Sequence, residues 1–313
     1  MNIMLTVSGI HSRSRKLIEA TRRFRKGELD YSELEKIFVN DVKNFVKVQE
    51  RAEIEIFSDG MLNWHDMLRP LIECVDGVKC GPYFRWFETN TFYRQPIVVE
   101  NLSVKREYIR RFFNFNLLPE EKKKIVILPG PYTCTILSKT KLSEGLNKFS
   151  KVIKDIVRSL EEYGELFILL QEPCLVYKKH FPDKRIFPKL KDVYSRICSE
   201  NPKNYIIHTY FGSIENVIEL LSELKCWIGV DMIETPYNIL EKLGRTNVVL
   251  GIVDSQNPII ETPKMINLYL KNFKEIENRE LIFCPNTDLR YLPRNIADKK
   301  ILALKKIMET LVN

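Results

Sequence analysis

The chain alternates short apolar runs with longer stretches of helical periodicity, and this alternation constrains its fold more than any other feature. Eight runs are rich in β-branched and aromatic residues; they cover 4–8, 53–57, 125–128, 167–170, 205–208, 227–233, 248–253 and 281–284. Most are apolar on successive residues, as strands covered on both faces are. Seven stretches carry apolar residues at helical spacing: 15–24, 31–50, 104–115, 142–163, 214–224, 265–273 and 297–311.

Repeated strand–helix units imply right-handed parallel crossovers. Eight such units predict one (β/α)8 TIM barrel that spans residues 1–313 as a single domain. The alternative is an open doubly wound sheet, but no GxGxxG turn follows any of the runs. Residues 83–102 break the alternation because they are aromatic-rich and strand-like, so we expect an inserted hairpin over the top of the barrel.

Composition narrows the classes of partner. The net charge is +8, which permits an anionic ligand, but the basic residues are spread along the chain and do not indicate nucleic acid. No stretch approaches the ~20 apolar residues of a membrane span. The seven cysteines form no CxxC pair and no signal peptide is evident, so we expect reduced thiols and a cytoplasmic protein.

Polar residues follow nearly all eight predicted strands, where the chemistry of such barrels collects. Asp59 and Glu172 are carboxylates at two of these positions and could serve in acid–base work, although isolated carboxylates are weak signals. The alternative, non-functional explanation for these polar residues is that the segments after strands are loops, and loops are generally polar. No GxSxG motif and no P-loop occurs.

A metal site is the next possibility. His208 and Glu234 follow successive predicted strands, and Cys284 or Asp288 could complete a set of ligands. Structural and catalytic zinc sites use three or four protein ligands. Because no further histidine lies on a later strand, a hydrogen-bonded strand-end histidine is favoured over a metal ligand.

The segment 85–94 concentrates two arginines and four aromatic residues. Arginine binds carboxylate or phosphate with two hydrogen bonds, and aromatic rings offer flat stacking faces, so a flat anionic ligand would suit this segment. Two alternatives remain open. The aromatic residues could form the core of a hairpin with solvated arginines, or they could stack on nucleic-acid bases.

These residues also carry a resemblance. RWFETNTFYRQP at 85–96 resembles the K-W-F-[ND]-T-N-x-H-Y-x-x-P segment in the N-terminal half of cobalamin-independent methionine synthase. Six further segments resemble that family in the same order along the chain: 8–20, 57–70, 129–139, 169–175, 208–217 and 284–293. The resemblance implies a barrel of the methionine synthase/uroporphyrinogen decarboxylase-like type.

The family's enzyme has two barrels, of which the C-terminal one holds zinc and homocysteine and the N-terminal one lacks zinc. His208 and Glu234 match the family's zinc-binding histidine and glutamate, but Tyr210 and Thr287 stand where it has cysteines. Gln171 replaces the aspartate of its D-E-P motif. With these departures, the chain resembles the zinc-less N-terminal half of the enzyme more than the catalytic half.

The resemblance implies a chain that binds a methyl-tetrahydrofolate or methyl-pterin donor, holds no tightly bound cofactor and is not active alone. Its expected partner is a separate zinc-bearing catalytic barrel that methylates homocysteine in methionine biosynthesis. The residues expected to bind the donor are Arg15, Asp59, Arg85, Trp86, Asn90, Tyr93 and Glu172. Arg15 and Arg85 match basic positions of the family's donor site, although the lysine after the first of these falls on Ile18. Two alternatives stay open: an autonomous methyltransferase with an altered metal site, and a non-enzymatic binder of another flat anion.

Overall fold

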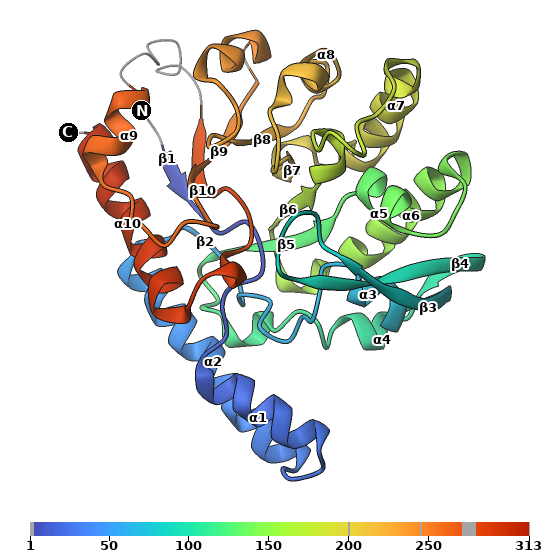
Figure 1. Cartoon of the computed structure of the whole chain (residues 1–313), viewed down its shortest axis with the longest axis vertical. Helices are drawn as coiled ribbons and strands as arrows, with labels where there is room; N and C mark the ends of the chain where they lie inside the picture. The colour runs from blue at the N-terminus through green and yellow to red at the C-terminus, as the bar shows by residue number, and fades with distance from the viewer. Residues whose placement is uncertain (1–2, 200, 245, 271–279, 313) are drawn as a thin grey trace.

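Eight parallel strands form one sheet that curls into a nearly closed barrel (Figure 1). The computed structural model describes residues 3–199, 201–244, 246–270 and 280–312. The strands are β1 (Ile3–Leu5), β2 (Ile56–Phe57), β5 (Lys123–Pro129), β6 (Leu166–Gln171), β7 (Tyr205–His208), β8 (Trp227–Asp231), β9 (Val248–Val253) and β10 (Leu281–Pro285). Their order is β1-β10-β9-β8-β7-β6-β5-β2. All eight predicted strands are present, and the predicted TIM-barrel fold is confirmed.

The barrel closes between β1 and β2 without a ladder of paired strand residues. The Glu55 N–H donates to the carbonyl of Leu5 over 3.3 Å, and the Thr6 hydroxyl donates to the carbonyl of Ile56 over 2.9 Å. Both contacts join the first strand region to the second. A third contact, from the Leu5 N–H to the Glu55 carboxylate over 2.6 Å, joins them, so among the described residues individual hydrogen bonds take the place of a ladder at this seam.

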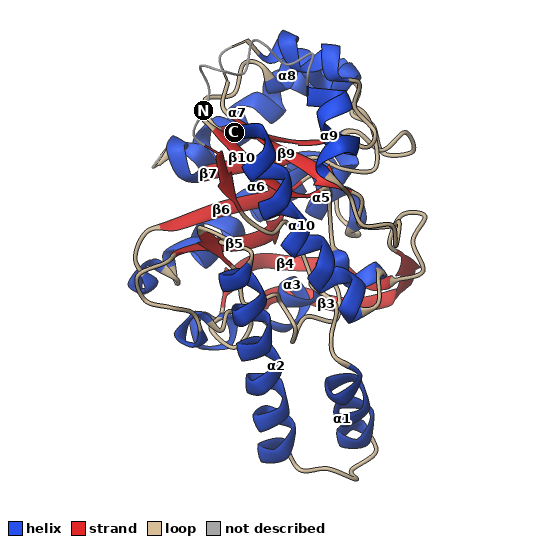
Figure 2. Cartoon of the chain, turned by 90° about the vertical axis from the view of Figure 1, so that its left-hand side faces the viewer, coloured by secondary structure: helices blue, strands red, loops and turns tan. Residues whose placement is uncertain are grey.

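Helices cover the outside of the sheet (Figure 2). They are α1 (Arg15–Arg25), α2 (Tyr31–Arg51), α3 (Arg69–Glu73), α4 (Arg106–Ile109), α5 (Pro131–Leu137), α6 (Leu142–Arg158), α7 (Phe187–Cys198), α8 (Ile218–Leu221), α9 (Pro263–Leu270) and α10 (Arg294–Val312). The sequence pattern missed α3, α5 and α7. Of the predicted helix 265–273, the part beyond Leu270 lies outside the described residues. No helix among the described residues is long and apolar enough to cross a membrane.

The helix predicted over 104–115 is wrong, since α4 has only four residues. Phe112 and Phe113 both pack edge-on against Trp64, with ring centroids 5.6 and 5.7 Å away. The Trp64 indole N–H also donates to the Phe112 carbonyl over 3.0 Å. Neighbouring residues on a helix point about 100° apart, so two adjacent rings cannot both face one tryptophan from a continuous helix. Tertiary packing here overrides the local periodicity.

The predicted insertion is an antiparallel hairpin, but it is longer than the expected 83–102. Its strands are β3 (Val75–Arg85) and β4 (Phe92–Val104). Glycines and a proline in residues 75–82 concealed the first half of β3 from the sequence analysis. A six-residue tip, 86–91, joins the strands, and the Trp86 N–H donates to the Thr91 carbonyl over 2.8 Å.

Two antiparallel helices, α1 and α2, project from the barrel as an arm (Figure 2). The Ser14 side chain caps α1 by accepting from the Leu17 N–H, and the Asp30 side chain caps α2 by accepting from the Glu33 N–H. Gly27 has a φ of 73° in the turn between them, a conformation that glycine adopts without a steric penalty. The loop after β1 and the chain entering β2 fix the base of this arm.

Two buried carboxyl groups hold the loops at the carboxyl ends of the strands. Glu172 accepts from the N–H groups of Tyr132 and Thr133 at 2.9 and 2.7 Å and from the Tyr194 hydroxyl at 2.7 Å. Asp231 accepts from the Phe211 N–H over 3.2 Å and from the Ile233 N–H over 3.0 Å. Burial raises the pKa of each carboxyl to about 7. The loops after β5, β7 and β8 are thereby anchored to the barrel.

We expect Phe149→Ala to lower the free energy of unfolding by about 3–5 kcal/mol, because it leaves a cavity where a fully buried ring of α6 packs. Leu142→Ala, on the same helix, is the control; its side chain is 37% exposed, so the expected loss is below about 1 kcal/mol. Denaturant titration measures both losses. Equal losses would contradict the burial of Phe149.

Asp231→Asn tests the buried carboxyl. The folded-state pKa of about 7 lies above the ordinary aspartate value of 3.8, so the folded chain holds this proton more tightly than the unfolded chain. Its contribution to stability is complete at low pH and is lost as pH rises toward 7. Relative to the variant, the unfolding free energy of the native chain should fall by roughly 2 kcal/mol between pH 5 and pH 7. A difference that does not change with pH would refute this pKa.

Candidate functional site

A pocket of about 400 Å³ lies at the carboxyl ends of the strands, beneath the hairpin tip. Its walls come from the tip and from the loops after β6, β7, β8 and β9. The lining residues are Phe87, Glu88, Thr89, Val176, Tyr177, Lys178, Phe211, Gly212, Ser213, Glu234 and Gln256. We call this cavity the mouth pocket. Its volume falls within the range of small-molecule sites.

Three aromatic rings line the mouth pocket. Phe87 packs edge-on against Tyr177, with ring centroids 5.0 Å apart. It also lies 5.4 Å from the ring of Phe211. These contacts join the hairpin tip to the loops after β6 and β7, so the tip covers the mouth of the barrel as the sequence predicted.

Phe87 and Phe211 share an uncommon backbone conformation. Their φ angles are 50° and 66°, in the left-handed region that residues with a side chain rarely adopt. Surrounding hydrogen bonds hold both turns: the Thr89 N–H and hydroxyl donate to the Trp86 carbonyl, and Asp231 accepts from the Phe211 N–H. Such strain is concentrated at ligand sites, and here it places two rings in one pocket.

Charged groups surround the rim. The Tyr177 hydroxyl donates to Glu88 over 2.9 Å, and Lys179 forms a 3.6 Å ion pair with the same carboxylate. The hydrogen bond from Tyr177, followed by the charge of Lys179, holds the pKa of Glu88 below its usual value. Lys178 and Glu234 add one charge of each sign to the lining. The rim can therefore contact both polar and anionic parts of a ligand.

Protein side chains seal the floor of the mouth. The Tyr210 hydroxyl donates to Gln171 Oε1 over 2.7 Å, and Gln171 Nε2 donates to the Ser8 carbonyl over 2.7 Å. Gln171 Nε2 also lies 3.4 Å from an Asp288 carboxylate oxygen, which accepts from the Ile10 N–H. Tyr210 and Gln171 are fully buried. This network occupies the centre of the barrel mouth, so the pocket lies above it.

The residues proposed as metal ligands are not brought together. Among the described residues, no group of three or more His, Cys, Asp or Glu side chains could hold a metal ion. His208 Nε2 bonds to the Asn286 carbonyl over 2.8 Å, and a methyl group on Gly229 would lie only 2.2 Å from His208 Nδ1. Cys284 contacts the Leu250 carbonyl, while Glu234 is exposed. This donor set does not fit a tetrahedral zinc ion.

Trp86 and Tyr93, expected as stacking faces, are buried in the hairpin. Their rings pack edge-on against each other at 5.7 Å, and Trp86 packs against Phe87 at 4.9 Å. Arg85 and Asn90 are exposed at the two ends of the tip. The ring that enters the lining is Phe87, which directly follows the tryptophan. The sequence analysis did not select Phe87 from the motif, and its positive φ could not be read from the sequence.

The other three expected residues lie outside the mouth pocket. The Asp59 carboxylate accepts from the N–H groups of Met61 and Asn114, both over 2.9 Å. Glu172 accepts hydrogen bonds from backbone N–H groups after β5, as described above. Arg15 is exposed on α1 and pairs with Glu19 over 2.8 Å. Asp59 and Glu172 therefore position loops.

None of the seven residues expected to bind the donor is in the lining of the mouth pocket. Besides Phe87, the sequence analysis did not select the lining residues Tyr177, Lys178 and Phe211, which come from the loops after β6 and β7. Each stands one or more residues beyond a strand-end motif, in a loop whose path depends on tertiary contacts. Phe211 does lie within the segment 208–217 singled out above.

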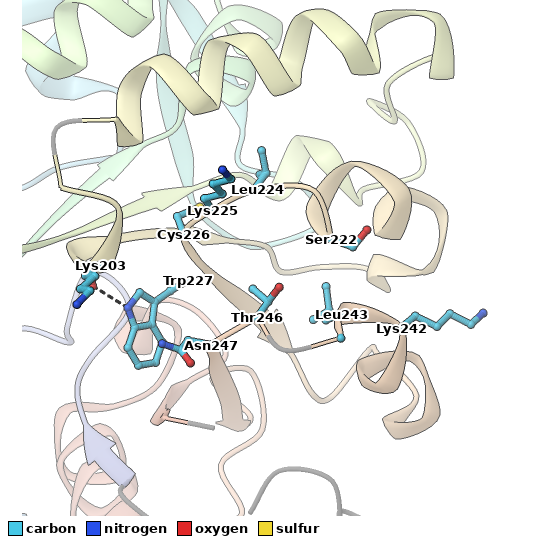
Figure 3. A pocket seen from close by; sticks show the side chains of 11 residues that line it. Lys203, Ser222, Leu224, Lys225, Cys226, Trp227, Lys242, Leu243, Thr246 and Asn247 are labelled. Carbon is cyan, nitrogen blue, oxygen red and sulfur yellow. Dashed lines mark hydrogen bonds between the residues drawn. The ribbon is translucent and has the colours of Figure 1, made fainter. Parts of the chain in front are cut away.

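A larger cavity of about 480 Å³ lies at the opposite end of the barrel (Figure 3). It surrounds the start of β8, where the Trp227 indole N–H donates to the Lys203 carbonyl over 2.7 Å. That end of a TIM barrel is associated with stability rather than chemistry. The mouth pocket is therefore the candidate site.

Comparisons with known proteins agree with this fold. Residues 76–278, about two thirds of the chain, match the family described as "Cobalamin-independent synthase, N-terminal domain". The methionine synthase of Sulfurisphaera tokodaii is 25% identical over 315 residues, covering 96% of this chain and 90% of the relative. That of Pyrococcus horikoshii is 24% identical over 322 residues, covering 97% and 91%.

Solved structures show the same architecture. A B12-independent methionine synthase from a Shewanella species, in complex with selenomethionine, matches with a TM-score of 0.77 at 18% identity, covering 99% of this chain and 97% of that one. A putative one from Listeria monocytogenes gives 0.77 at 16% identity, with 99% of both chains covered. These likenesses support the fold, and the match to the family itself confirms the resemblance found in the sequence. The chain belongs to the cobalamin-independent methionine synthase family.

Proposed function

We propose that this chain is a barrel of the zinc-less, N-terminal-half type that binds a methyl-tetrahydrofolate or related methyl-pterin donor. It then acts with a separate zinc-bearing catalytic barrel in homocysteine methylation. The observation that carries this proposal is the shape of the mouth pocket, which has aromatic walls and a floor sealed by Tyr210 and Gln171. A flat ligand can enter the pocket above this buried network.

The pocket suits a pterin ring. Phe87, Tyr177 and Phe211 offer aromatic surface to a flat heterocycle. Gln256 offers both a donor and an acceptor to its ring edge. Arg85 is exposed next to the tip, where it can bind a carboxylate of a glutamate tail. Arg15 is exposed on α1, and only the family resemblance connects it with the donor.

In this proposal the chain contributes binding and orientation. Methyl transfer breaks the bond between the donor nitrogen and the methyl carbon and forms a bond from that carbon to the homocysteine sulfur. Holding the donor rigidly makes the encounter of the reacting atoms effectively unimolecular. No residue of this chain is assigned to proton transfer or to metal binding.

One observation favours a second candidate, an autonomous methyltransferase. The chain covers about 90% of the length of curated relatives that carry the name methionine synthase, so single barrels of this size bear that name. A metal site in this chain would have to assemble from His208, Glu234, Asp288 or Cys284 after a rearrangement of their present contacts. The two candidates differ in zinc content and in solitary activity.

We expect Phe87→Ala to weaken binding of 5-methyltetrahydrofolate about tenfold, because it removes a ring from the pocket wall. Phe84→Ala is the matched control: Phe84 lies in the same hairpin and is 45% exposed, so its loss should leave affinity unchanged. Isothermal titration calorimetry measures both. Equal affinity of Phe87→Ala and the native chain would place the donor elsewhere, and no binding by the native chain would favour another flat anion.

Metal analysis and activity assays separate the two candidates. The purified chain should hold less than about a tenth of an equivalent of zinc, because the donor set does not match a tetrahedral site. It should not methylate homocysteine alone, and it should raise the rate of a separate zinc-bearing barrel. Stoichiometric zinc, or turnover by the chain alone, would establish the autonomous enzyme instead.

A further inference from the structure

A second cavity, of about 330 Å³, lies outside the mouth pocket at the base of the projecting arm. It is enclosed by α1, by the first half of α2 and by two segments of the barrel, 61–65 and 111–117. We call it the arm pocket. It shares no lining residue with the mouth pocket.

The body of the arm pocket is apolar. Leu17 of α1, Phe38 of α2 and Leu62 from the loop after β2 line it. Leu17 and Leu62 are buried and Phe38 is half-buried. Contact with such surfaces favours a hydrocarbon or aromatic group.

One end of the arm pocket is strongly basic. Arg13 and His65 line it, and Arg25 and Arg290 stand directly beside them. Arg25 Nη2 lies 3.3 Å from the His65 ring, and Arg290 Nη2 donates to the His65 carbonyl over 3.0 Å. Burial, followed by the charges of Arg13 and Arg25, lowers the pKa of His65 to about 4. Burial and the neighbouring arginines also lower the pKa of Arg13 to about 10, so at neutral pH Arg13 is charged and His65 is neutral.

Direct ion pairs among the described residues do not neutralise this positive charge, although Asp41 interacts electrostatically with Arg13, and Asp66 and Asp288 with Arg290. Within the described part of the chain, Arg13, Arg25 and Arg290 make no ion pair with a carboxylate; their bonds go to carbonyl groups and to the His65 ring. The nearby carboxylates have other partners: Asp66 pairs with Arg69 over 3.2 Å, and Asp41 pairs with Arg294 over 3.2 Å. Glu35 lines the pocket from α2 and is exposed.

An unmatched acceptor adds to this pattern. Asn63 lines the pocket, and its Nδ2 donates to the Arg111 carbonyl over 2.6 Å. Its Oδ1 is buried and has no donor among the described residues. Buried polar atoms normally have a hydrogen-bond partner, so this oxygen offers an acceptor to a ligand N–H or O–H group.

We propose that the arm pocket binds a mid-sized organic acid, with an aromatic or aliphatic body against Leu17, Phe38 and Leu62 and an anionic group held by Arg13. The site is independent of the proposed function. Arg15, which the family resemblance connects with the donor, is not part of the lining and pairs with Glu19 in solvent. An arginine in a half-buried site binds such an anion through charge-assisted hydrogen bonds.

The probe is 8-anilinonaphthalene-1-sulfonate, an aromatic anion whose fluorescence rises in apolar surroundings. N-phenyl-1-naphthylamine, which lacks the sulfonate, is the uncharged comparison. We expect one equivalent of the anionic probe to bind at least tenfold more tightly than the neutral one. Hydrogen exchange should slow in segments 61–65 and 111–117 when the anionic probe is added.

Variants locate the site. Arg13→Gln should weaken the anionic probe about tenfold and leave the neutral probe unchanged, because it removes one charge-assisted contact. Phe38→Ala should weaken both probes. Arg25→Gln changes an exposed side chain and tests the same charge cluster if Arg13→Gln fails to fold.

Two controls complete the test. Arg15→Gln removes an exposed charge from α1 and should leave the affinity for both probes unchanged. Phe87→Ala alters only the mouth pocket and should likewise leave probe affinity unchanged. Loss of probe binding with Arg15→Gln would indicate general attraction to the basic arm and overturn the proposal, as would unchanged affinity in Arg13→Gln or Arg25→Gln. Loss with Phe87→Ala would assign the probe to the mouth pocket instead.

Discussion

The hydrogen bond from Tyr210 to Gln171 determines what the mouth of this barrel can do. Both side chains are fully buried, so each needs the other as a partner. Gln171 also donates a hydrogen bond to the Ser8 carbonyl, in the loop after the first strand. This buried network crosses the mouth of the barrel, and none of its side chains is in the lining of the pocket under the hairpin tip.

The hairpin provides the contact surface for a ligand that the buried network of Tyr210 and Gln171 does not offer. Its tip adds a roof and an aromatic wall to the mouth, and two strained phenylalanines, Phe87 and Phe211, meet there from separate segments. The backbone strain at these residues opposes folding, whereas packing against Tyr177 and the buried Asp231 carboxyl offset it. The site is thus organised by contacts between loops, and the strands below serve as its foundation.

Much of the fold was predictable because it rests on periodicity. All eight barrel strands follow from apolar runs in the local sequence, and the aromatic-rich segment 83–102 indicated the hairpin but not the first half of β3. The short length of α4 was not predictable: the periodicity over 104–115 predicts a longer helix, but Phe112 and Phe113 both pack on Trp64 beyond its end. The candidate site was predictable only in part: the motif at 85–96 indicated the hairpin tip, but the lining depends on Phe87 and Phe211, whose backbone angles are set by distant residues.

The seam between β1 and β2 has a consequence for motion. Elsewhere the barrel is joined by ladders of paired residues, but here, among the described residues, individual hydrogen bonds made by Glu55 and Thr6 span the join. Regions with few hydrogen bonds open first in the native state. The arm is attached at both edges of this join, α1 following β1 and α2 preceding β2. Local opening of the barrel would therefore begin between β1 and β2, and the arm, which connects these two strands, would restrain it.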